Sequence, residues 1–317
     1  MRYESITRPD GAFQQALTAP QVVAVCRRGF GREPVSAVEL GGGSFNTTYR
    51  VDLGGETVIL RVAPARSYRI ERDFMRHEHA SLPFFAPIAD LMPRTLFVDF
   101  THDLVPRDYT FQTMLGGVSG AEGFRALTDK PGFFRQVGEI VRVVHEVRGE
   151  RFGRPAGPTH ATWSEAVLST VDDTVADIRD AGLDDSDMRE VGVLAAKNAA
   201  VLDGVTEPRL LHGDLWVPNV RLDGERIVGV FDHDRASWGD PAADWSVYEA
   251  GRKPGTARDA FWDTYGRPST SPGAVWRSAL YRAVHLGAVR IERHRLGLAD
   301  TIPANYEDMA RVLAELR

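Results

Sequence analysis

The sequence predicts an α+β fold in which a small β-rich lobe is followed by a larger, mainly helical lobe. Short segments of β-branched and aromatic residues dominate before Leu115, whereas helical periodicity dominates after it. One hairpin pattern, with Asp223 and Gly224 at its turn, interrupts the helical part. We therefore expect two domains, residues 1–114 and residues 115–317.

The first lobe is predicted to contain three strands with helices around them. The strands are residues 57–62 (TVILRV), 95–100 (TLFVDF) and 109–114 (YTFQTM), because each is rich in residues that pack well on a pleated surface. The helices are residues 20–29 and 70–82.

The second lobe begins with a long amphipathic helix. Phe133, Val137, Ile140, Val144 and Val147 recur at helical spacing, so they form one apolar stripe.

Further helices are expected over residues 163–181 and 188–202. They precede the hairpin, whose strands are residues 219–222 and 226–231.

Composition excludes several classes of protein. The chain has 317 residues, 43% of them hydrophobic, which is enough for a buried core. A net charge of −6 argues against nucleic-acid binding through bulk charge. No stretch approaches the roughly 18 to 20 apolar residues of a membrane helix, and residues 1–10 lack the apolar core of a secretory signal. Cys26 is the only cysteine, which excludes an internal disulfide. We expect a cytoplasmic enzyme without nucleic-acid or membrane partners, and the sequence carries no signal for an oligomeric state.

The strongest chemical signal is an apolar run that ends in His212-Gly213-Asp214, with Asn219 five residues after the aspartate. An aspartate can orient a hydroxyl and accept its proton, and asparagine is a neutral oxygen ligand for Mg²⁺. The second strand of the hairpin then delivers Asp232, which could hold a metal ion that bridges phosphate oxygens. A capped loop would explain any one of these residues alone, but not the whole set.

A glycine-rich turn in the first lobe is a second candidate site. Glycines let the backbone approach phosphates, and neighbouring hydroxyl and amide groups can contact them. The candidate nucleotide-binding residues of this turn are Gly42, Gly43, Ser44 and Asn46. The alternative is a plain hairpin turn.

Arg61 is the one basic residue in the strand that follows this turn. A cation among core residues should point into a cleft, where it could hold the α- and β-phosphates. The alternative is a surface arginine on an edge strand.

These segments resemble the aminoglycoside phosphotransferase and choline kinase branch of the protein-kinase-like enzymes. The signature H-G-D-x-x-x-x-N runs from His212 to Asn219, and residues 238–245 resemble the family's G-D-P-x-x-D-L segment, with Trp245 in place of leucine. The resemblance implies a bilobal protein-kinase-like fold, with a nucleotide-binding first lobe and a catalytic, acceptor-binding second lobe. It also implies ATP and Mg²⁺ as cofactors, Asp214 as the catalytic base, and Asn219 and Asp232 as the metal ligands.

The resemblance implies roles for further residues. Glu78 matches the helix glutamate that would hold Arg61, although Glu71 lies on a similar face. Backbone groups near Gln112 to Met114 would pair with the adenine edge.

Other polar residues near the motifs are interpreted as structural. Asp240 and Asp244 are expected to cap helices, and His145 and His212 to be buried and hydrogen-bonded. His77 and His79 fall on different faces of one helix, so they are expected to be surface or packing residues rather than a metal pair.

The acceptor site is the least predictable part of the chain. Trp216, Asp234 and Trp238 are the candidate acceptor contacts, because they lie in or beside the motifs. The alternatives are that the tryptophans fill the core, and that Asp234 supports the metal site or holds the loop. The stretch from Asp172 to Asp187 contains seven aspartates, which could bind a polycation or form a solvated helix face.

The function expected is transfer of the γ-phosphate of ATP to a hydroxyl of a small molecule. The acceptor expected first is an antibiotic of aminoglycoside, nucleoside or peptide type. The alternatives are a metabolite kinase for choline, a sugar or an amino alcohol, and a non-catalytic nucleotide-binding pseudokinase. A protein kinase is disfavoured, because the motif reads H-G-D and no activation segment separates Asp232 from Asp240.

Overall fold

The computed structural model describes residues 1–9 and 11–317, which form two compact units. The first unit comprises Met1–Ser67 and Met92–Gly116, and the second comprises Tyr68–Leu91 and Gly117–Arg317. The sequence placed one boundary between residues 114 and 115. The structure differs in that Tyr68–Leu91 packs with the second unit.

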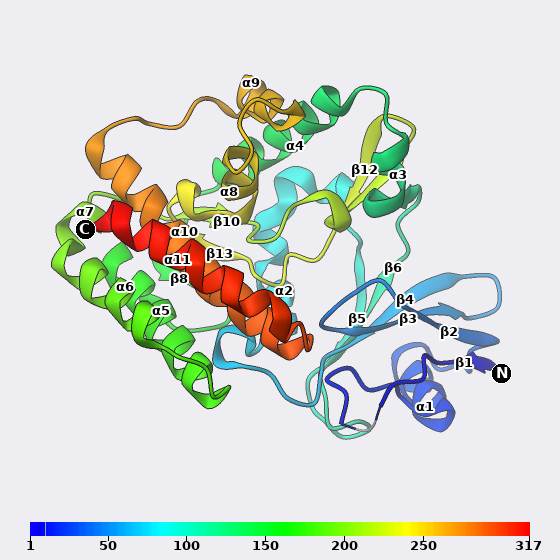
Figure 1. The fold of residues 1–317 in the computed structure, drawn as a ribbon. Helices are drawn as coiled ribbons and strands as arrows, with labels where there is room; N and C mark the ends of the chain where they lie inside the picture. The colour runs from blue at the N-terminus through cyan, green and yellow to red at the C-terminus, as the bar shows by residue number, and fades with distance from the viewer. Residues whose placement is uncertain (10) are drawn as a thin grey trace. The chain divides into compact units, whose positions relative to one another are not determined.

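The first unit is a six-stranded sheet with one helix beside it (Figure 1). The sheet order is β1-β2-β3-β4-β6-β5, and all pairs are antiparallel except β1 with β2. The elements are β1 (Arg2–Glu4), α1 (Ala19–Phe30), β2 (Ser36–Leu40), β3 (Thr47–Asp52), β4 (Thr57–Val62), β5 (Thr95–Asp99) and β6 (Tyr109–Thr113). The three strands predicted for this region are confirmed within one residue.

Alternating side chains of the central strands form the core of the first unit. Tyr49 and Val51 of β3 and Leu60 of β4 are fully buried, and Val22 and Val25 of α1 cover them. The capping box of Thr18 and Gln21 begins α1, and Gly31 in the left-handed conformation ends it.

The second unit is mainly helical. Its first elements are a 3₁₀ turn (Arg69–Glu71), α2 (Phe74–Ser81), a 3₁₀ segment (Leu82–Leu91), β7 (Val118–Ser119), α3 (Gly120–Ala126), α4 (Lys130–His145), β8 (Phe152–Gly153), β9 (Thr159–His160), α5 (Trp163–Asp180), α6 (Ser186–Lys197) and α7 (Ala199–Leu202). The remainder are β10 (Arg209–Leu211), a 3₁₀ turn (Val217–Asn219), β11 (Val220–Asp223), β12 (Arg226–Val230), β13 (Ser237–Gly239), a 3₁₀ turn (Pro241–Ala243), α8 (Trp245–Gly251), a 3₁₀ turn (Ala257–Ala260), α9 (Phe261–Tyr265), α10 (Pro272–Arg295), a 3₁₀ turn (Ala299–Thr301) and α11 (Ile302–Leu316).

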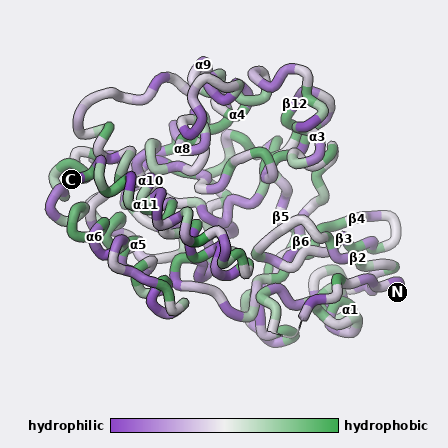
Figure 2. The backbone as a smooth tube through the Cα atoms, in the orientation of Figure 1, coloured by the Kyte–Doolittle hydropathy of each residue, from purple (hydrophilic) through white to green (hydrophobic). Residues whose placement is uncertain are grey.

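The apolar stripe predicted for α4 is confirmed, since Phe133, Val137, Ile140 and Val144 are buried. A larger core lies between α5, α6, α10 and α11, and the last two helices run side by side (Figure 1). Hydrophobic residues alternate with hydrophilic ones along the chain, as amphipathic elements require (Figure 2). Within the described residues, no helix combines the length and hydrophobicity needed to cross a membrane.

The hairpin is confirmed as β11 and β12, but two predicted helices are interrupted. The helix expected over residues 70–82 breaks at Asp73, whose φ of 61° is left-handed and stops helical hydrogen bonding, so α2 begins at Phe74. The helix expected over residues 188–202 is divided at Asn198, which has φ −110° and ψ 27°.

Candidate active site

The loop between β10 and β11 carries the H-G-D motif. Its glycine, Gly213, has a φ of 79°, a conformation that side-chain-bearing residues rarely adopt. A Cβ atom at this position would also overlap the carbonyl oxygen of Arg235. The bend that presents Asp214 therefore requires glycine.

A buried carboxylate, Asp244, fixes the backbone of this loop. Its Oδ2 accepts hydrogen bonds from the backbone N–H groups of His212 (2.8 Å) and Gly213 (3.2 Å) and from His145 Nε2 (3.3 Å). Although burial alone would raise the pKa of Asp244, hydrogen bonds from His145 and the Ser246 backbone hold it well below its usual value. Asp244 also caps α8, and Asp240 caps the preceding 3₁₀ turn, so the capping interpretation is confirmed for both.

The two histidines beside this loop are buried, as predicted. His145 Nδ1 lies 2.9 Å from the hydroxyl of Tyr265. His212 Nδ1 accepts a hydrogen bond from the backbone N–H of Asp214 at 3.4 Å. Burial, assisted by repulsion from His233, lowers the pKa of His212 to about 3, so this ring stays neutral and shapes the loop.

Asp214 is half-buried and held by the asparagine of the motif. Asn219 Nδ2 donates to the backbone oxygen of Asp214 at 2.7 Å and to its Oδ2 at 3.0 Å. Burial raises the pKa of Asp214 to about 7; the Arg235 guanidinium opposes this rise and the Asp232 carboxylate adds to it. A carboxylate poised in this way is suited to accept a proton from a hydroxyl.

Three acidic side chains converge beside Asp214. Glu78, Asp232 and Asp234 each place a carboxylate oxygen within 4.8 Å of the others. Asp232 lies two residues after the end of β12 and has a φ of 65°, a conformation that aspartate tolerates better than most residues. Several carboxylate oxygens at this spacing form a donor set that fits a hard divalent cation such as Mg²⁺. The amide of Asn219 already faces Asp214 through Nδ2, which leaves its Oδ1 as the atom suited to a metal.

The two glutamates considered as partners of Arg61 have different surroundings. Glu71 is buried and accepts a hydrogen bond from Arg295 Nε at 2.9 Å. Its carboxylate is therefore paired within the second unit. The convergence of Glu78 with Asp232 and Asp234 is a relationship that the sequence did not indicate.

His77 and His79 fall on different surfaces of α2, in agreement with the sequence. His77 is buried and accepts a hydrogen bond from the backbone N–H of Ala156 at 3.2 Å, whereas His79 is exposed.

In the first unit, the glycine-rich turn joins β2 to β3. Gly42, Gly43 and Ser44 are exposed, whereas Asn46 is buried. Gln14 Nε2 donates to the backbone oxygens of Gly43 (3.1 Å) and Asn46 (2.8 Å), so this side chain supports the turn from outside it. No sequence signal marked Gln14, because the contact depends on a segment about thirty residues away.

Arg61 lies on β4 and is only 7% exposed. Its cross-strand neighbours are Thr48 of β3 and Thr110 of β6, so it occupies the middle of the sheet rather than an edge. Gln112 is buried at the end of β6, and Met114 follows it with 46% exposure.

The candidate acceptor contacts divide into an exposed residue and two buried ones. Trp216 is 41% exposed within the loop that carries the H-G-D motif, and Asp234 belongs to the acidic cluster. Trp238 is buried in β13, where its ring packs against Phe84 with centroids 4.9 Å apart. This position fits the alternative that Trp238 fills the core.

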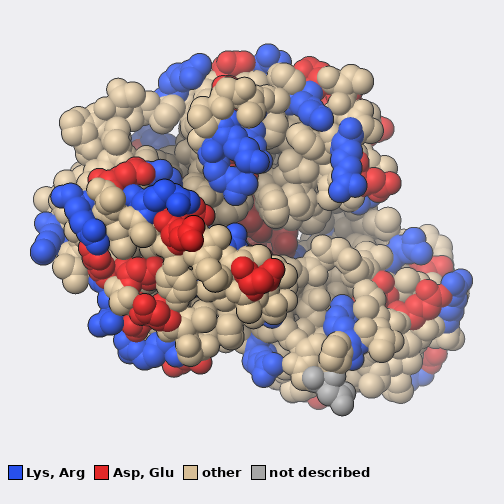
Figure 3. All heavy atoms as spheres, viewed as in Figure 1, with Lys and Arg blue, Asp and Glu red and all other residues tan. Residues whose placement is uncertain are grey.

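The aspartates of residues 172–187 mostly form structural interactions. Asp177 and Asp180 bind Arg69, Asp185 binds Arg179 and Arg189, and Asp187 binds Arg290, while Asp184 accepts from Ser186. Figure 3 shows acidic and basic side chains interspersed over α5, α6 and α11, not gathered by sign. The structure therefore favours the solvated helix face over an acidic wall.

Arg235 is the main site residue that the sequence analysis missed. Its guanidinium contributes the largest favourable charge interaction at Asp214, and it lies 3.5 Å from Glu292 of α10. A motif-based search cannot find this pair, because α10 is far away in the sequence and carries no recognisable pattern.

A model of the phosphotransferase enzyme family, APH, matches residues 36–279. No curated protein matches the sequence. Several solved structures share the fold. A thermostable mutant of aminoglycoside phosphotransferase APH(4)-Ia, in a ternary complex with AMP-PNP and hygromycin B, has a TM-score of 0.67 at 18% identity, over 93% of this chain and 98% of that one.

Two other solved structures have the same architecture. The GDP complex of a mutant aminoglycoside 2'-phosphotransferase-IIIa has a TM-score of 0.64 at 17% identity, over 94% of this chain and 98% of that one. A candidate fructosamine-3-kinase from Haemophilus somnus 129PT has a TM-score of 0.66 at 14% identity, over 92% of this chain and 96% of that one. These matches confirm the expected protein-kinase-like α+β fold.

Proposed function

The chain belongs to the phosphotransferase enzyme family, and we propose that it transfers the γ-phosphate of ATP to a hydroxyl group of a small molecule. The observation that carries this proposal is the arrangement around Asp214. A half-buried carboxylate is held by Asn219 and lies beside a cluster of acidic oxygens that fits a divalent cation.

Asp214 acts on the acceptor. Its carboxylate orients the hydroxyl and takes its proton as the oxygen–phosphorus bond forms and the bond from the γ-phosphorus to the β-phosphate oxygen breaks, which releases ADP. Asp244 keeps this loop in place through its bonds to His212 and Gly213.

Two parts of the chain bind the nucleotide. Gly42, Gly43, Ser44, Asn46 and Arg61 contact the phosphates, and backbone groups near Gln112 to Met114 pair with the adenine edge. Asn219 and Asp232 would hold Mg²⁺, whose contribution is to neutralise charge on the phosphate oxygens. Glu78 either forms an ion pair with Arg61 or adds an oxygen to the metal site. The dependence of the rate on the ATP and Mg²⁺ concentrations in Glu78→Gln distinguishes these two roles.

The acceptor proposed first is an antibiotic, of aminoglycoside, nucleoside or peptide type. The likeness to antibiotic phosphotransferases, one of them with hygromycin B bound, supports it. The likeness to a candidate fructosamine-3-kinase favours the alternative of a metabolite kinase. The presence of Asp214, Asn219 and Asp232 disfavours a non-catalytic pseudokinase.

A coupled ADP-release assay with ATP, Mg²⁺ and a panel of antibiotics, choline and sugars tests the proposal. We expect acceptor-dependent turnover that Asp214→Ala abolishes. Asp223→Asn, which changes an exposed aspartate of the neighbouring hairpin, should retain it. Nucleotide binding without turnover for any acceptor would favour the pseudokinase, and absence of nucleotide binding in a thermal-shift assay would contradict both.

A further inference from the structure

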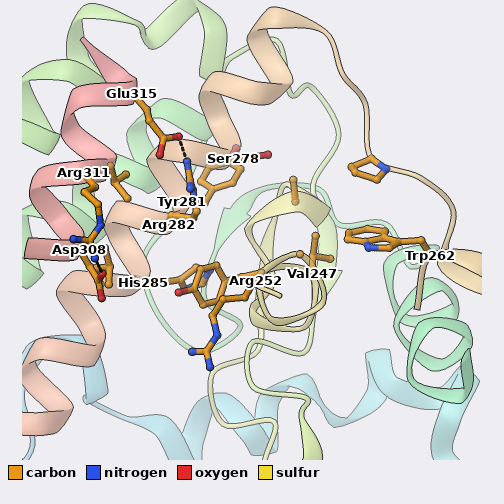
Figure 4. A pocket seen from close by; sticks show the side chains of 16 residues that line it. Val247, Arg252, Trp262, Ser278, Tyr281, Arg282, His285, Asp308, Arg311 and Glu315 are labelled. Atoms are coloured by element: carbon orange, nitrogen blue, oxygen red, sulfur yellow. Dashed lines mark hydrogen bonds and ion pairs between the residues drawn. The ribbon is translucent and has the colours of Figure 1, made fainter. Parts of the chain in front are cut away.

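The second unit contains a cavity of about 670 Å³ between α8, α9, α10 and α11 (Figure 4). This volume lies within the range of small-molecule sites. Aromatic side chains form much of its wall, with Tyr248 from α8, Trp262 from α9 and Tyr281 from α10. Such rings bind planar aromatic groups and the apolar faces of sugars.

Both carboxylates of this wall are paired with arginines of the same wall. Glu315 forms an ion pair with Arg282, and Asp308 forms one with Arg311. Arg252 is a further cation on the wall, and its partner Glu249 also binds Arg258. The cavity therefore offers an excess of positive charge and commits both of its carboxylates.

A polycation is poorly suited to such a cavity. Each ammonium group that leaves water needs a carboxylate partner, because the desolvation of a charge without one is strongly unfavourable. The other acidic region, residues 172–187, is also largely engaged in ion pairs.

His285 adds an uncharged aromatic ring to the wall. Its Nε2 is buried and has no hydrogen-bond partner among the described residues. Because burial lowers the pKa of His285 to about 4, the imidazole is neutral at physiological pH. The ring, whose other nitrogen bonds the backbone of Ala243, therefore contributes an uncharged aromatic surface to the wall.

The cavity shares structural elements with the catalytic loop. Ala242 and Tyr248, which line it, flank Asp244, the residue that binds the backbone of His212 and Gly213. A ligand in the cavity therefore rests against the segment that fixes the loop of Asp214.

We propose that this cavity binds the acceptor, and that the acceptor is a neutral or singly anionic molecule with an aromatic or sugar ring, not a polycation. This inference rests on the proposed phosphotransferase function and narrows its substrate class.

Calorimetric titration of the nucleotide-free protein tests the ligand class. The probes are 4-nitrophenyl β-D-glucoside, the corresponding glucuronide, which differs by one carboxylate, and kanamycin as a polycation. We expect both aryl glycosides to bind at least about tenfold more tightly than kanamycin, since the latter leaves ammonium groups without partners.

Three variants locate the site. Trp262→Leu should weaken both aryl glycosides by about fivefold through the lost ring contact. Arg252→Glu should weaken the glucuronide by about tenfold and leave the glucoside nearly unchanged. Ser278→Trp, at an exposed position on the lip, should obstruct binding of both probes without disturbing the core. Arg267→Glu is the matched control, because this exposed arginine does not line the cavity.

Tighter binding of kanamycin, no binding of either aryl glycoside, or affinities unchanged by Trp262→Leu and Ser278→Trp would overturn the proposal. Turnover is a separate measurement. The acceptor role would be overturned if the variants weaken aryl glycoside binding, as expected, but the protein transfers phosphate only to other acceptors. A protein that transfers phosphate to none would refute the proposed function while leaving the ligand site intact.

Discussion

The Oδ2 atom of Asp244 accepts a hydrogen bond from the backbone N–H of His212 at 2.8 Å, across a separation of 32 residues. The same oxygen accepts from the N–H of Gly213 at 3.2 Å. One carboxylate thus joins the start of α8 to the loop that carries Asp214. The position of the proposed base depends on this contact as much as on the motif.

Substitution of Asp244 should therefore affect both stability and turnover. In Asp244→Ala the buried N–H groups of His212 and Gly213 lose their acceptor, which should lower the free energy of unfolding by about 2–4 kcal/mol. Displacement of the loop should lower kcat by about a hundredfold in the protein that remains folded. Urea unfolding and steady-state kinetics at a temperature where the variant is folded measure the two effects.

A second aspartate provides the control. Asp203 accepts from the backbone N–H (2.9 Å) and the hydroxyl (3.0 Å) of Ser164 at the start of α5. Asp203→Ala should cost about 1–2 kcal/mol of stability and leave kcat unchanged. Equal losses of kcat in the two variants would show that destabilisation alone explains the effect.

Two left-handed glycines should respond differently to alanine. At Gly213 a Cβ atom would overlap the Arg235 carbonyl, whereas at Gly224, with a φ of 55°, no atom lies within 4 Å. Gly224→Ala should cost about 1 kcal/mol through the backbone conformation alone. Gly213→Ala should cost more than this and also lower kcat, because the loop must move to relieve the overlap. Similar stability and kinetics in the two variants would contradict the steric argument.

Local patterns predicted the parts of the site that are continuous in sequence. The H-G-D motif, Asn219 and the hairpin that delivers Asp232 lie within one short segment, and side-chain chemistry at fixed spacing identified them. The central strands followed from β-branched composition in the same way. These features need no knowledge of the packing between distant elements.

Features that depend on distant packing were not predictable. Arg235 forms an ion pair with Glu292, and Gln14 donates a hydrogen bond to the glycine-rich turn. Both contacts exist only because elements distant in the sequence pack together. The break at Asp73 was missed because aspartate has no strong preference against helix interiors. The sequence left open whether Trp238 contacts a ligand or fills the core, because the residue type and its place beside the motif are the same in both cases.

The buried ion pair of Glu71 and Arg295 should be visible as a stability effect. Both side chains are almost fully buried, with exposures of 3% and 2%. Glu71→Gln removes the negative partner and leaves a buried guanidinium, which should lower the free energy of unfolding by about 3–5 kcal/mol. The double variant Glu71→Leu, Arg295→Met should recover much of this loss, because it buries no charge. A double variant less stable than either single one would show that the pair has further essential contacts.

The stability of the protein should depend on pH through His285. Burial lowers its pKa from the usual 6.5 to about 4, while Asp244 opposes and Arg235 assists to a smaller extent. Between these two values the unfolded chain binds a proton that the folded chain does not, so stability falls as the pH decreases from about 7 towards 4. At about pH 5 this linkage should cost the wild type about 2 kcal/mol.

His285→Phe retains ring contacts with Trp245 and Tyr248 but has no proton to bind. The free energy of unfolding of the wild type minus that of this variant should therefore be constant above about pH 7.5. At about pH 5 this difference should be lower by about 2 kcal/mol. Urea unfolding of both proteins across this range measures the difference, and parallel curves at all pH values would show that His285 does not titrate in this way.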